Sequence, residues 1–266
     1  RMRMEQTISS TSKSPFATEP IGRLIVKFAV PCVISLLVNS LYNIVDQIFI
    51  GWGVGHLGNG ATNAVFPITI VALALCLMIG DGGAAYLSLK LGEGDIASAK
   101  RGVGNAIVMV VVVSIVLAAL FLIFIDPILT LFGATDTLRE YALQYGTIIG
   151  VGLPFMMIPG AVNSMIRADG SPKYAMLSMA LGAVVNTILD PVFIFVFHMG
   201  VRGAAIATVI GQVATFVMAV TYLFRFKTFR IDRSAFRMKA KTCTTVLSLG
   251  VSSFITQFAI TIVMAL

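Results

Sequence analysis

Long apolar stretches dominate this sequence and restrict what it can fold into. They lie at about 24–50, 61–89, 103–125, 143–166, 174–197 and 203–224, and a seventh begins near Cys243. A helix needs about 20 consecutive apolar residues to cross the hydrocarbon core of a bilayer. Because every backbone polar group in lipid must be satisfied within the segment, each stretch predicts a transmembrane helix. We therefore expect an all-α membrane protein.

The composition supports a membrane-embedded chain. Hydrophobic residues make up 58% of the 266 residues and charged residues 12%, which is too little charge to solvate a globular domain of this size. The stretch at 24–50 is too long for a signal-peptide core and lacks a small-residue cleavage site, so we expect it to be retained. The three cysteines show no spacing typical of a disulfide framework or a zinc site.

The basic residues predict the orientation of the helices. The sequence has 19 Lys and Arg residues, and all but Arg139 and Arg202 lie in the N-terminal tail, in alternate loops and in segment 225–241. Basic residues in short loops stay on the cytoplasmic side. We expect an integral plasma-membrane protein with a cytoplasmic N-terminus. The net charge of +7 then reflects topology, and no nucleic-acid partner is expected.

The same pattern predicts four regions along the chain. They are a cytoplasmic tail (1–23), a six-helix lobe (24–224), a basic cytoplasmic linker (225–241) and the start of a second lobe (242–266). The linker is expected to be solvated, although its basic residues would also suit anionic lipid. Because the sequence stops inside the seventh apolar stretch, we expect a fragment of a longer molecule.

Prolines inside the apolar stretches predict bent helices. Pro31 lies in the first stretch, Pro154 and Pro159 in the fourth, and Pro191 in the fifth. Each proline removes a backbone donor and clashes with the preceding turn.

Asp46 and Asp190 are carboxylates within membrane-spanning stretches. An Asp at the centre of such a helix costs about 2.5–3.5 kcal/mol even on the lenient insertion scale, so an intramembrane acid predicts ion or proton traffic. Asn186 lies one helical turn before Asp190, and Pro191 follows, which frees the carbonyl of Thr187 for an ion, a water or a hydroxyl. The alternative is a polar kink whose groups satisfy one another.

A second polar stripe occupies the first stretch. Asn39, Asn43 and Asp46 share one helix face, with Tyr42 beside them. Such a stripe predicts a surface that faces the bundle interior or a wet cavity. For the asparagines, the alternative is a seam of hydrogen bonds between packed helices.

The sixth stretch places a hydroxyl at the same depth as the two acids. Its small residues recur every fourth position, at Gly203, Ala207, Gly211 and Thr215, which favours close helix approach, and Thr208 lies next to that face. With the predicted topology, Asp46, Asp190 and Thr208 all lie roughly 6–11 Å from the outer membrane end of their helices. We expect one cluster of Asp46, Asn186, Asp190 and Thr208. Oxygen ligands of this kind suit a hard cation such as Na⁺, or a proton.

Four motifs resemble those of a known transporter family. They are "DQIFIG" ending the first stretch, "NSMIRADGSPKYAM" joining the fourth and fifth, "NTILDPVFIF" in the fifth and "GVRGAAIATVIGQ" opening the sixth. The chain resembles the multidrug and toxic compound extrusion (MATE) transporters, more specifically the DinF-like branch. The resemblance implies a two-lobe, twelve-helix antiporter that exports organic cations, drugs or other amphipathic compounds in exchange for Na⁺ or H⁺.

The resemblance also implies roles for individual residues. The cation-site positions of the family fall on the same four residues, Asp46, Asn186, Asp190 and Thr208. The substrate-cavity positions fall on Asn39, Tyr42, Asn163 and Met179, and Pro31 matches a proline proposed as a protonation-linked switch. Beyond the coupling ion no cofactor is implied. The implied partners are the bilayer, a small amphipathic or cationic substrate and the second lobe of the same polypeptide.

Other functions remain open at this stage. A flippase for lipids or lipid-linked glycans would favour a groove lined with basic residues, which the apolar stretches almost entirely lack. A membrane scaffold without transport activity would tolerate replacement of Asp46 and Asp190 by Asn. An enzyme is disfavoured because no nucleophile, base and orienting group share a plausible site.

Overall fold

The computed structural model of the chain describes residues 20–132 and 135–265, so most of the expected tail at 1–23 lies outside the described residues. The elements in chain order are α3 (Ile21–Gly53), α4 (His56–Gly92), α5 (Ile96–Ile123), α6 (Ile125–Leu131), α7 (Asp136–Ala168), α8 (Pro172–Pro191), the π-helix η1 (Val192–Val196), α9 (Val201–Leu223), the 3₁₀-helix η2 (Arg233–Phe236) and α10 (Ala240–Ala265). Within this part of the chain, seven helices are long and apolar enough to cross a membrane. The prediction of an all-α membrane protein is confirmed.

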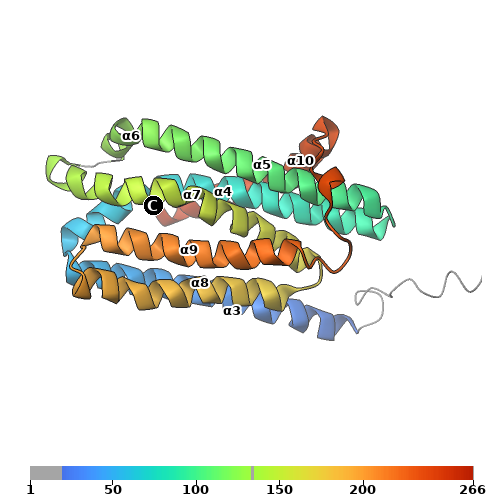
Figure 1. Cartoon of the computed structure of the whole chain (residues 1–266), viewed down its shortest axis with the longest axis horizontal. Coiled ribbons are helices and arrows are strands. Elements are labelled where there is room, and N and C mark those ends of the chain that lie inside the picture. Colours follow the sequence, from blue (N-terminus) through green and yellow to red (C-terminus); the bar gives the residue numbers. More distant parts are fainter. Residues whose placement is uncertain (1–19, 133–134, 266) are drawn as a thin grey trace, which may run out of the picture.

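Six long helices run alongside one another in alternating directions (Figure 1). Helix α7 lies at the centre, where it contacts α4, α5 and α9, and α9 in turn packs on α8. Helix α3 lies at the edge of the bundle against α8, with much of its apolar surface exposed. One end of the bundle, called the linker end, carries the start of α3 and the segment between α9 and α10 (Figure 1).

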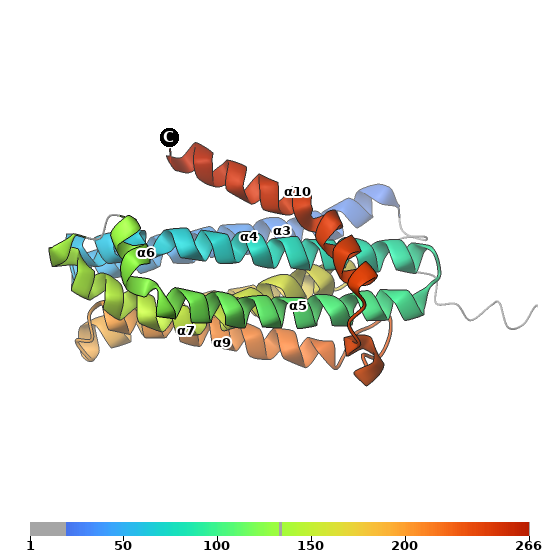
Figure 2. The same cartoon turned by 90° about the horizontal axis from the view of Figure 1, so that it is seen from above.

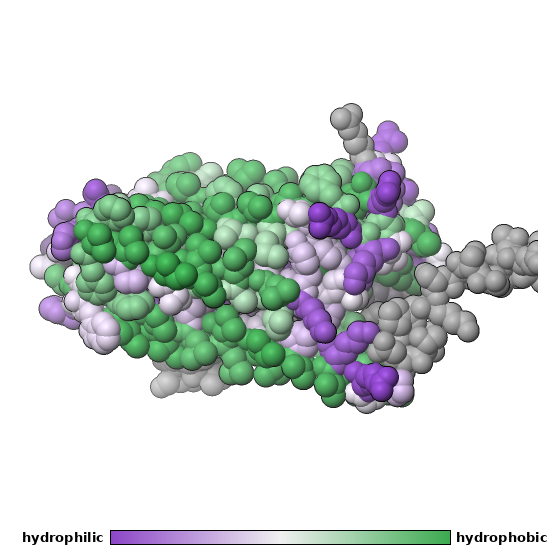
Figure 3. Space-filling model, turned by 60° about the horizontal axis from the view of Figure 1, so that its bottom comes forward, coloured by the Kyte–Doolittle hydropathy of each residue, from purple (hydrophilic) through white to green (hydrophobic). Residues whose placement is uncertain are grey.

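The surface has the polarity expected of a membrane-embedded bundle. Apolar side chains cover most of the length of the face shown in Figure 3, whereas hydrophilic side chains gather toward the two ends. Several helices extend a few residues beyond the apolar stretches. Helix α5 starts seven residues earlier than expected, where Asp95 caps it by accepting a hydrogen bond from the backbone N–H of Ser98 at 3.0 Å.

The prolines act unequally on the helices. Helices α3 and α7 continue through Pro31, Pro154 and Pro159 without ending. Pro191 instead marks a change of helix type, because the wider π-helix η1 begins at the next residue. Short π-helical turns occur frequently at functional sites, and this one lies directly beside Asp190.

Helix α10 crosses α4 obliquely (Figure 2) and packs on it through glycines. A Cβ atom added to Gly82 would lie 2.0 Å from the carbonyl oxygen of Val246, and one added to Gly250 would lie 1.8 Å from that of Met78. The two backbones are therefore in direct contact. Whether α10 opens a second lobe stays a prediction.

The segment that follows α9 is held against the bundle by Asp169. This carboxylate lies at the end of α7 and accepts hydrogen bonds from the Tyr222 hydroxyl at 2.7 Å, from the backbone N–H groups of Lys227 at 2.8 Å and Thr228 at 3.1 Å, and from the Thr228 hydroxyl. Asp169 is buried. Residues 227 and 228 are thus fixed to the junction of α7 and α8.

A second set of contacts fixes the following residues to α5. Lys100 forms an ion pair with Asp232, which also accepts hydrogen bonds from the backbone and hydroxyl of Ser234 at 3.1 and 2.5 Å. The Lys100 ammonium and the Ser234 hydroxyl lower the pKa of Asp232 to about 2, so this carboxylate stays ionised at physiological pH. A Cβ atom on Gly104 would lie 2.2 Å from the carbonyl oxygen of Ala235. The linker is thus docked on the bundle at these points, while most of its side chains are exposed.

We expect Asp169→Ala to release the linker. The substitution removes four hydrogen bonds to a carboxylate, each worth about 1.5–3 kcal/mol when the acceptor is charged. Limited trypsin digestion in membranes should then cut within 225–237 faster than in the unmodified chain. Asp126→Ala serves as the control, because it removes a carboxylate at the opposite end of the bundle. Equal cutting rates in both variants would show that Asp169 does not hold the linker.

Candidate functional site

Helices α8 and α9 approach each other through glycines, as the small residues of the sixth stretch indicate. A Cβ atom on Gly211 would lie 2.6 Å from the carbonyl oxygen of Gly182, and one on Gly182 would lie 2.8 Å from that of Gly211. The Thr215 hydroxyl, which lies within 3.2 Å of the carbonyl oxygens of Ser178 and Gly211, closes the same contact. This crossing brings the polar residues of the two helices together.

Asn186 joins the polar groups of α8 and α9. Its side-chain nitrogen lies 3.2 Å from Asp190 Oδ1 and 3.3 Å from the Thr208 hydroxyl, and it donates to both. Asn186 is 2% exposed and Asp190 0% exposed. The amide therefore orients one carboxylate and one hydroxyl within a site closed to solvent.

Helix α3 adds the second carboxylate. Asp46 is 6% exposed, and its carboxyl group lies close enough to that of Asp190 for one protonated group to donate to the other. The structure thus brings together Asp46, Asn186, Asp190 and Thr208, from three different helices. Asp46 and Thr208 each lie about 10 Å along the helix axis from the helix end opposite the linker, in agreement with the shared depth.

Three buried oxygen atoms of this cluster have no hydrogen-bond donor within the described residues. They are Asp46 Oδ1, Asn186 Oδ1 and Asp190 Oδ2. Buried polar atoms are nearly always paired, because an unpaired one costs the free energy of its lost hydration. All three are acceptors, so the group that would satisfy them is a cation or a proton donor. A hard monovalent cation fits this donor set.

The expected substrate residues lie in two separate places. Tyr42 belongs to the cluster region, since it lies within electrostatic range of Asp46 and Asp190, and Asn39 lies one turn earlier on α3. Asn163 is buried between α7 and α8, where it accepts a hydrogen bond from Ser178 at 3.0 Å.

Met179, next to Ser178, lies roughly 10 Å along α8 from Asn186. Pro31 is more distant, about 22 Å along α3 from Asp46. Pro191 adjoins the cluster directly. The residues given a substrate role are therefore spread along α3, α7 and α8, and only Tyr42 borders the acidic cluster.

Two residues that lie beside the cluster are not predicted from the sequence. Tyr145 of α7 is buried within electrostatic range of Asp46, Tyr42 and Asp190. Thr62 of α4 donates to the side-chain oxygen of Gln47 at 3.1 Å, beside Asp46. Their proximity to the acids arises from contacts between different helices, so only the packing of the helices reveals it.

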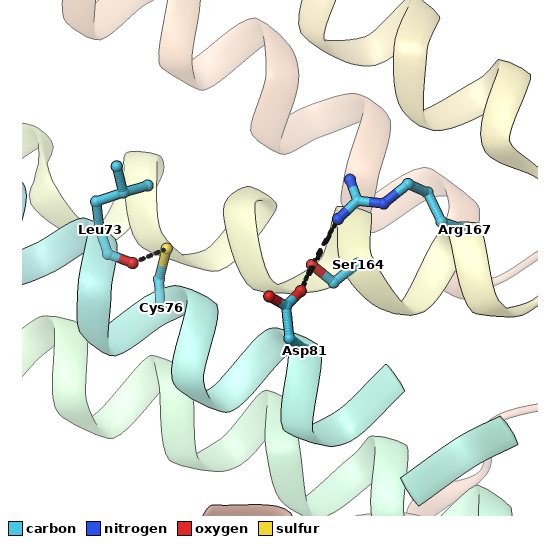
Figure 4. Close-up of polar contacts among 5 residues, drawn as sticks. All are labelled: Leu73, Cys76, Asp81, Ser164 and Arg167. Carbon is cyan, nitrogen blue, oxygen red and sulfur yellow. Dashed lines mark hydrogen bonds and ion pairs between the residues drawn. The ribbon is translucent and has the colours of Figure 1, made fainter. Parts of the chain in front are cut away.

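Asp81 forms a different polar group at the junction of α4 and α7. Figure 4 shows the Ser164 hydroxyl donating to Asp81 at 2.7 Å and Arg167 donating to Ser164 at 2.8 Å. Arg167 Nη2 lies 3.9 Å from the Asp81 carboxylate. Cys76, which precedes Asp81 on α4, donates a hydrogen bond to the carbonyl oxygen of Leu73. Because Asp81 is paired with a cation, it is a packing acid here and not part of the cluster with Asp46.

Comparisons with known proteins give a consistent result. The family model described as MatE matches residues 31–192. The FAD transporter of Shewanella oneidensis is 29% identical over 231 residues, which cover 83% of this chain and 50% of that protein. The multidrug export protein MepA of Staphylococcus aureus is 26% identical over 210 residues, which cover 79% of this chain and 47% of that protein.

Solved structures share the fold. A crystal structure of MATE in complex with MaD3S superposes with a TM-score of 0.85 at 27% identity, covering 90% of this chain and 54% of that one. An outward-facing multidrug resistance MATE transporter of the MOP superfamily gives a TM-score of 0.83 at 27% identity, covering 90% of this chain and 53% of that one. The chain thus spans about half the length of these relatives.

We expect Gly211→Ala to disrupt the site by separating α8 from α9. The new methyl group would meet the Gly182 carbonyl oxygen at 2.6 Å and Asn186 Cβ at 3.1 Å, and overpacking of this kind costs about 1–3 kcal/mol. The melting temperature of the purified chain should fall. Gly22→Ala is the matched control, because its Cβ atom has nothing within 4 Å. An unchanged melting temperature for Gly211→Ala would contradict the close crossing.

Proposed function

Because this chain belongs to the MatE family of membrane transporters, we propose that it forms the first half of a cation-coupled exporter of small amphipathic or cationic molecules. Relatives described as multidrug export proteins support the direction of transport. The FAD transporter among the relatives shows that substrates in this group extend beyond drugs, and supports an amphipathic substrate class in general.

The observation that carries this proposal is the group of unpaired oxygens on Asp46, Asn186 and Asp190. With both carboxylates ionised, the cluster has a charge of −2 in a low-dielectric bundle, which is unfavourable. One Na⁺ ion or one proton relieves part of this charge. Loading and release of that cation then give the free energy difference that drives a change of conformation.

Both coupling ions fit the geometry. Na⁺ would be held by the three unpaired oxygens with the Thr208 hydroxyl as a fourth ligand. A proton would be shared by the facing carboxyl groups of Asp46 and Asp190. In both cases Asn186 orients the Asp190 carboxylate and needs no charge of its own.

Substrate export follows from competition with the cation. Tyr42 borders the cluster on α3, Asn39 lies one turn earlier, and both are partly exposed, so a substrate bound there would meet the same carboxylates. The binding surface would be completed by the second half of the transporter, and alternating access would come from rocking of the two halves. Asn163 and Met179 would contribute at a separate position, nearer the linker end.

Neither competing function explains the site. A flippase for phosphorylated lipids would need cations facing the bundle interior, but Arg167 is already engaged by Ser164 and Asp81. A scaffold would have no need for two facing carboxylates with unpaired oxygens, because apolar residues of the same size would pack at lower cost.

We expect Asp190→Asn to abolish coupled transport in the intact transporter that contains this chain. The amide retains the shape and much of the hydrogen bonding of the carboxyl group but removes the exchangeable charge. Transport of a fluorescent organic cation in proteoliposomes, under separately imposed sodium and pH gradients, measures the effect. Asp126→Asn is the control, because Asp126 is exposed and is paired with Arg139 instead of with the cluster. Full coupled transport by Asp190→Asn would refute the site.

The same assay separates the two coupling ions. Thr208→Ala removes a ligand that is useful to Na⁺ but is not required to carry a proton. We expect sodium-driven transport to fall more than proton-driven transport. Equal losses under both gradients would mean that Thr208 supports the fold of the site and not the ion.

The proposed orientation has its own test. Reporter fusions at Lys13 and Arg233 should both indicate the cytoplasmic side, because the tail and the linker hold most of the basic residues. Lys13 lies outside the described residues, so this measurement relies on charge alone at that position. A reporter on the outer side at either position would reverse the assignment of depth.

A further inference from the structure

A cavity of about 520 Å³ lies between the start of α5 and the docked linker. Its cationic residues are Lys100 and Arg101 from α5 and Arg230 from the linker, and the Ser234 hydroxyl lies beside them. The apolar part of its wall includes Ile96 and Phe229. This cavity is at the linker end of the bundle, far from the acidic cluster.

The three cations of the cavity differ in their pairing. Lys100 is neutralised by Asp232. Among residues 20–132 and 135–265, Arg101 and Arg230 form no ion pair. Asp95, which interacts electrostatically with Arg101, is occupied as the cap of α5. The cavity therefore has two guanidinium groups that are free to bind an anion. A guanidinium group binds phosphate oxygens with two parallel hydrogen bonds.

The rim of the cavity distinguishes a lipid from a free anion. Ile96 is 53% exposed, and the neighbouring linker residues Phe236 and Met238 are 41% and 54% exposed. Such a combination of exposed apolar groups and basic groups is typical of proteins that contact the headgroup region of a bilayer.

The linker presents these groups in a fixed position. Asp169 anchors residues 227 and 228 just before Phe229 and Arg230, and Asp232 anchors Ser234 just after them. The wall of the cavity is thus held in place on both sides without a ligand. A rigid site loses less conformational entropy when it binds.

We propose that this cavity binds the phosphate of an anionic phospholipid from the leaflet that surrounds the linker end. Arg101 and Arg230 hold the phosphate, and Ile96, Phe236 and Met238 contact the upper part of the acyl chains. Because Arg101 belongs to α5 and Arg230 to the linker, the bound lipid joins the two. This role is independent of the ion that the acidic cluster takes.

The unmodified chain tests the choice of headgroup. It is reconstituted in nanodiscs that contain equal amounts of phosphatidylglycerol and phosphatidylcholine, and the lipids that it retains are counted by native mass spectrometry. We expect retention of phosphatidylglycerol over phosphatidylcholine. Equal retention of the two lipids would overturn the proposal, and so would displacement of phosphatidylglycerol by excess inorganic phosphate, which would identify a site for free anions.

Variants locate the lipid. The double substitution Arg101→Gln and Arg230→Gln removes the two unpaired guanidinium groups, and we expect about a twentyfold loss of affinity for phosphatidylglycerol. The matched control, Arg237→Gln with Lys239→Gln, removes the same charge from exposed positions of the same linker outside the cavity. An equal loss in both variants would mean that net charge, and not this cavity, attracts the lipid. Helix content from circular dichroism establishes that both variants fold.

Discussion

Two carboxylates buried face to face form the interaction on which the rest of this structure depends. Asp46 and Asp190 come from helices that are distant in the chain, and among the described residues neither forms an ion pair with a cation. The cost of this arrangement is tolerated because the surrounding helices hold it in place: α8 and α9 meet at Gly182 and Gly211, and Asn186 bridges to Thr208. An acidic pair held in this way gains stability when a cation or proton binds, which is the basis of the coupling that we propose.

Three other acids of the described chain are paired by donors from the protein itself, and they have structural roles. Asp81 is paired with Arg167 through Ser164, Asp169 is saturated by donors from the linker, and Asp232 is paired with Lys100. Each of these acids joins two elements and has its donors supplied by the protein. Among the carboxylates of the described residues, only Asp46 and Asp190 have buried oxygens without a hydrogen-bond donor, so they are the acids open to an external cation.

The linker gains a structural role from two of these pairs. A basic segment between two sets of helices has the composition of a solvated connection, yet Asp169 and Lys100 fix it to the ends of α7 and α5. In the exporter that we propose, a docked linker would transmit movement between the two halves more directly than a flexible one. The proposed lipid site would let the composition of the membrane act on the protein at the same place.

The sequence by itself determined the membrane helices and the identity of the polar residues among them. Apolar stretches of spanning length admit only helices in lipid, and an acid such as Asp190 within one is costly enough to indicate a function. Helical spacing also placed Asn186 one turn from Asp190, and the predicted depth in the membrane placed Thr208 level with them. These inferences use distances along a single helix, which the sequence fixes, and a topology read from charge.

Only the tertiary structure decided which groups on different helices meet. Spacing along a helix gives no rotation of one helix against another, so Tyr145 beside the acids, Thr62 beside Gln47 and Ser164 between Asp81 and Arg167 all follow from packing. The change to a π-helix after Pro191 and the docking of the linker by Asp169 are of the same kind. Each depends on contacts between residues far apart in the chain, whose geometry is set when the helices assemble.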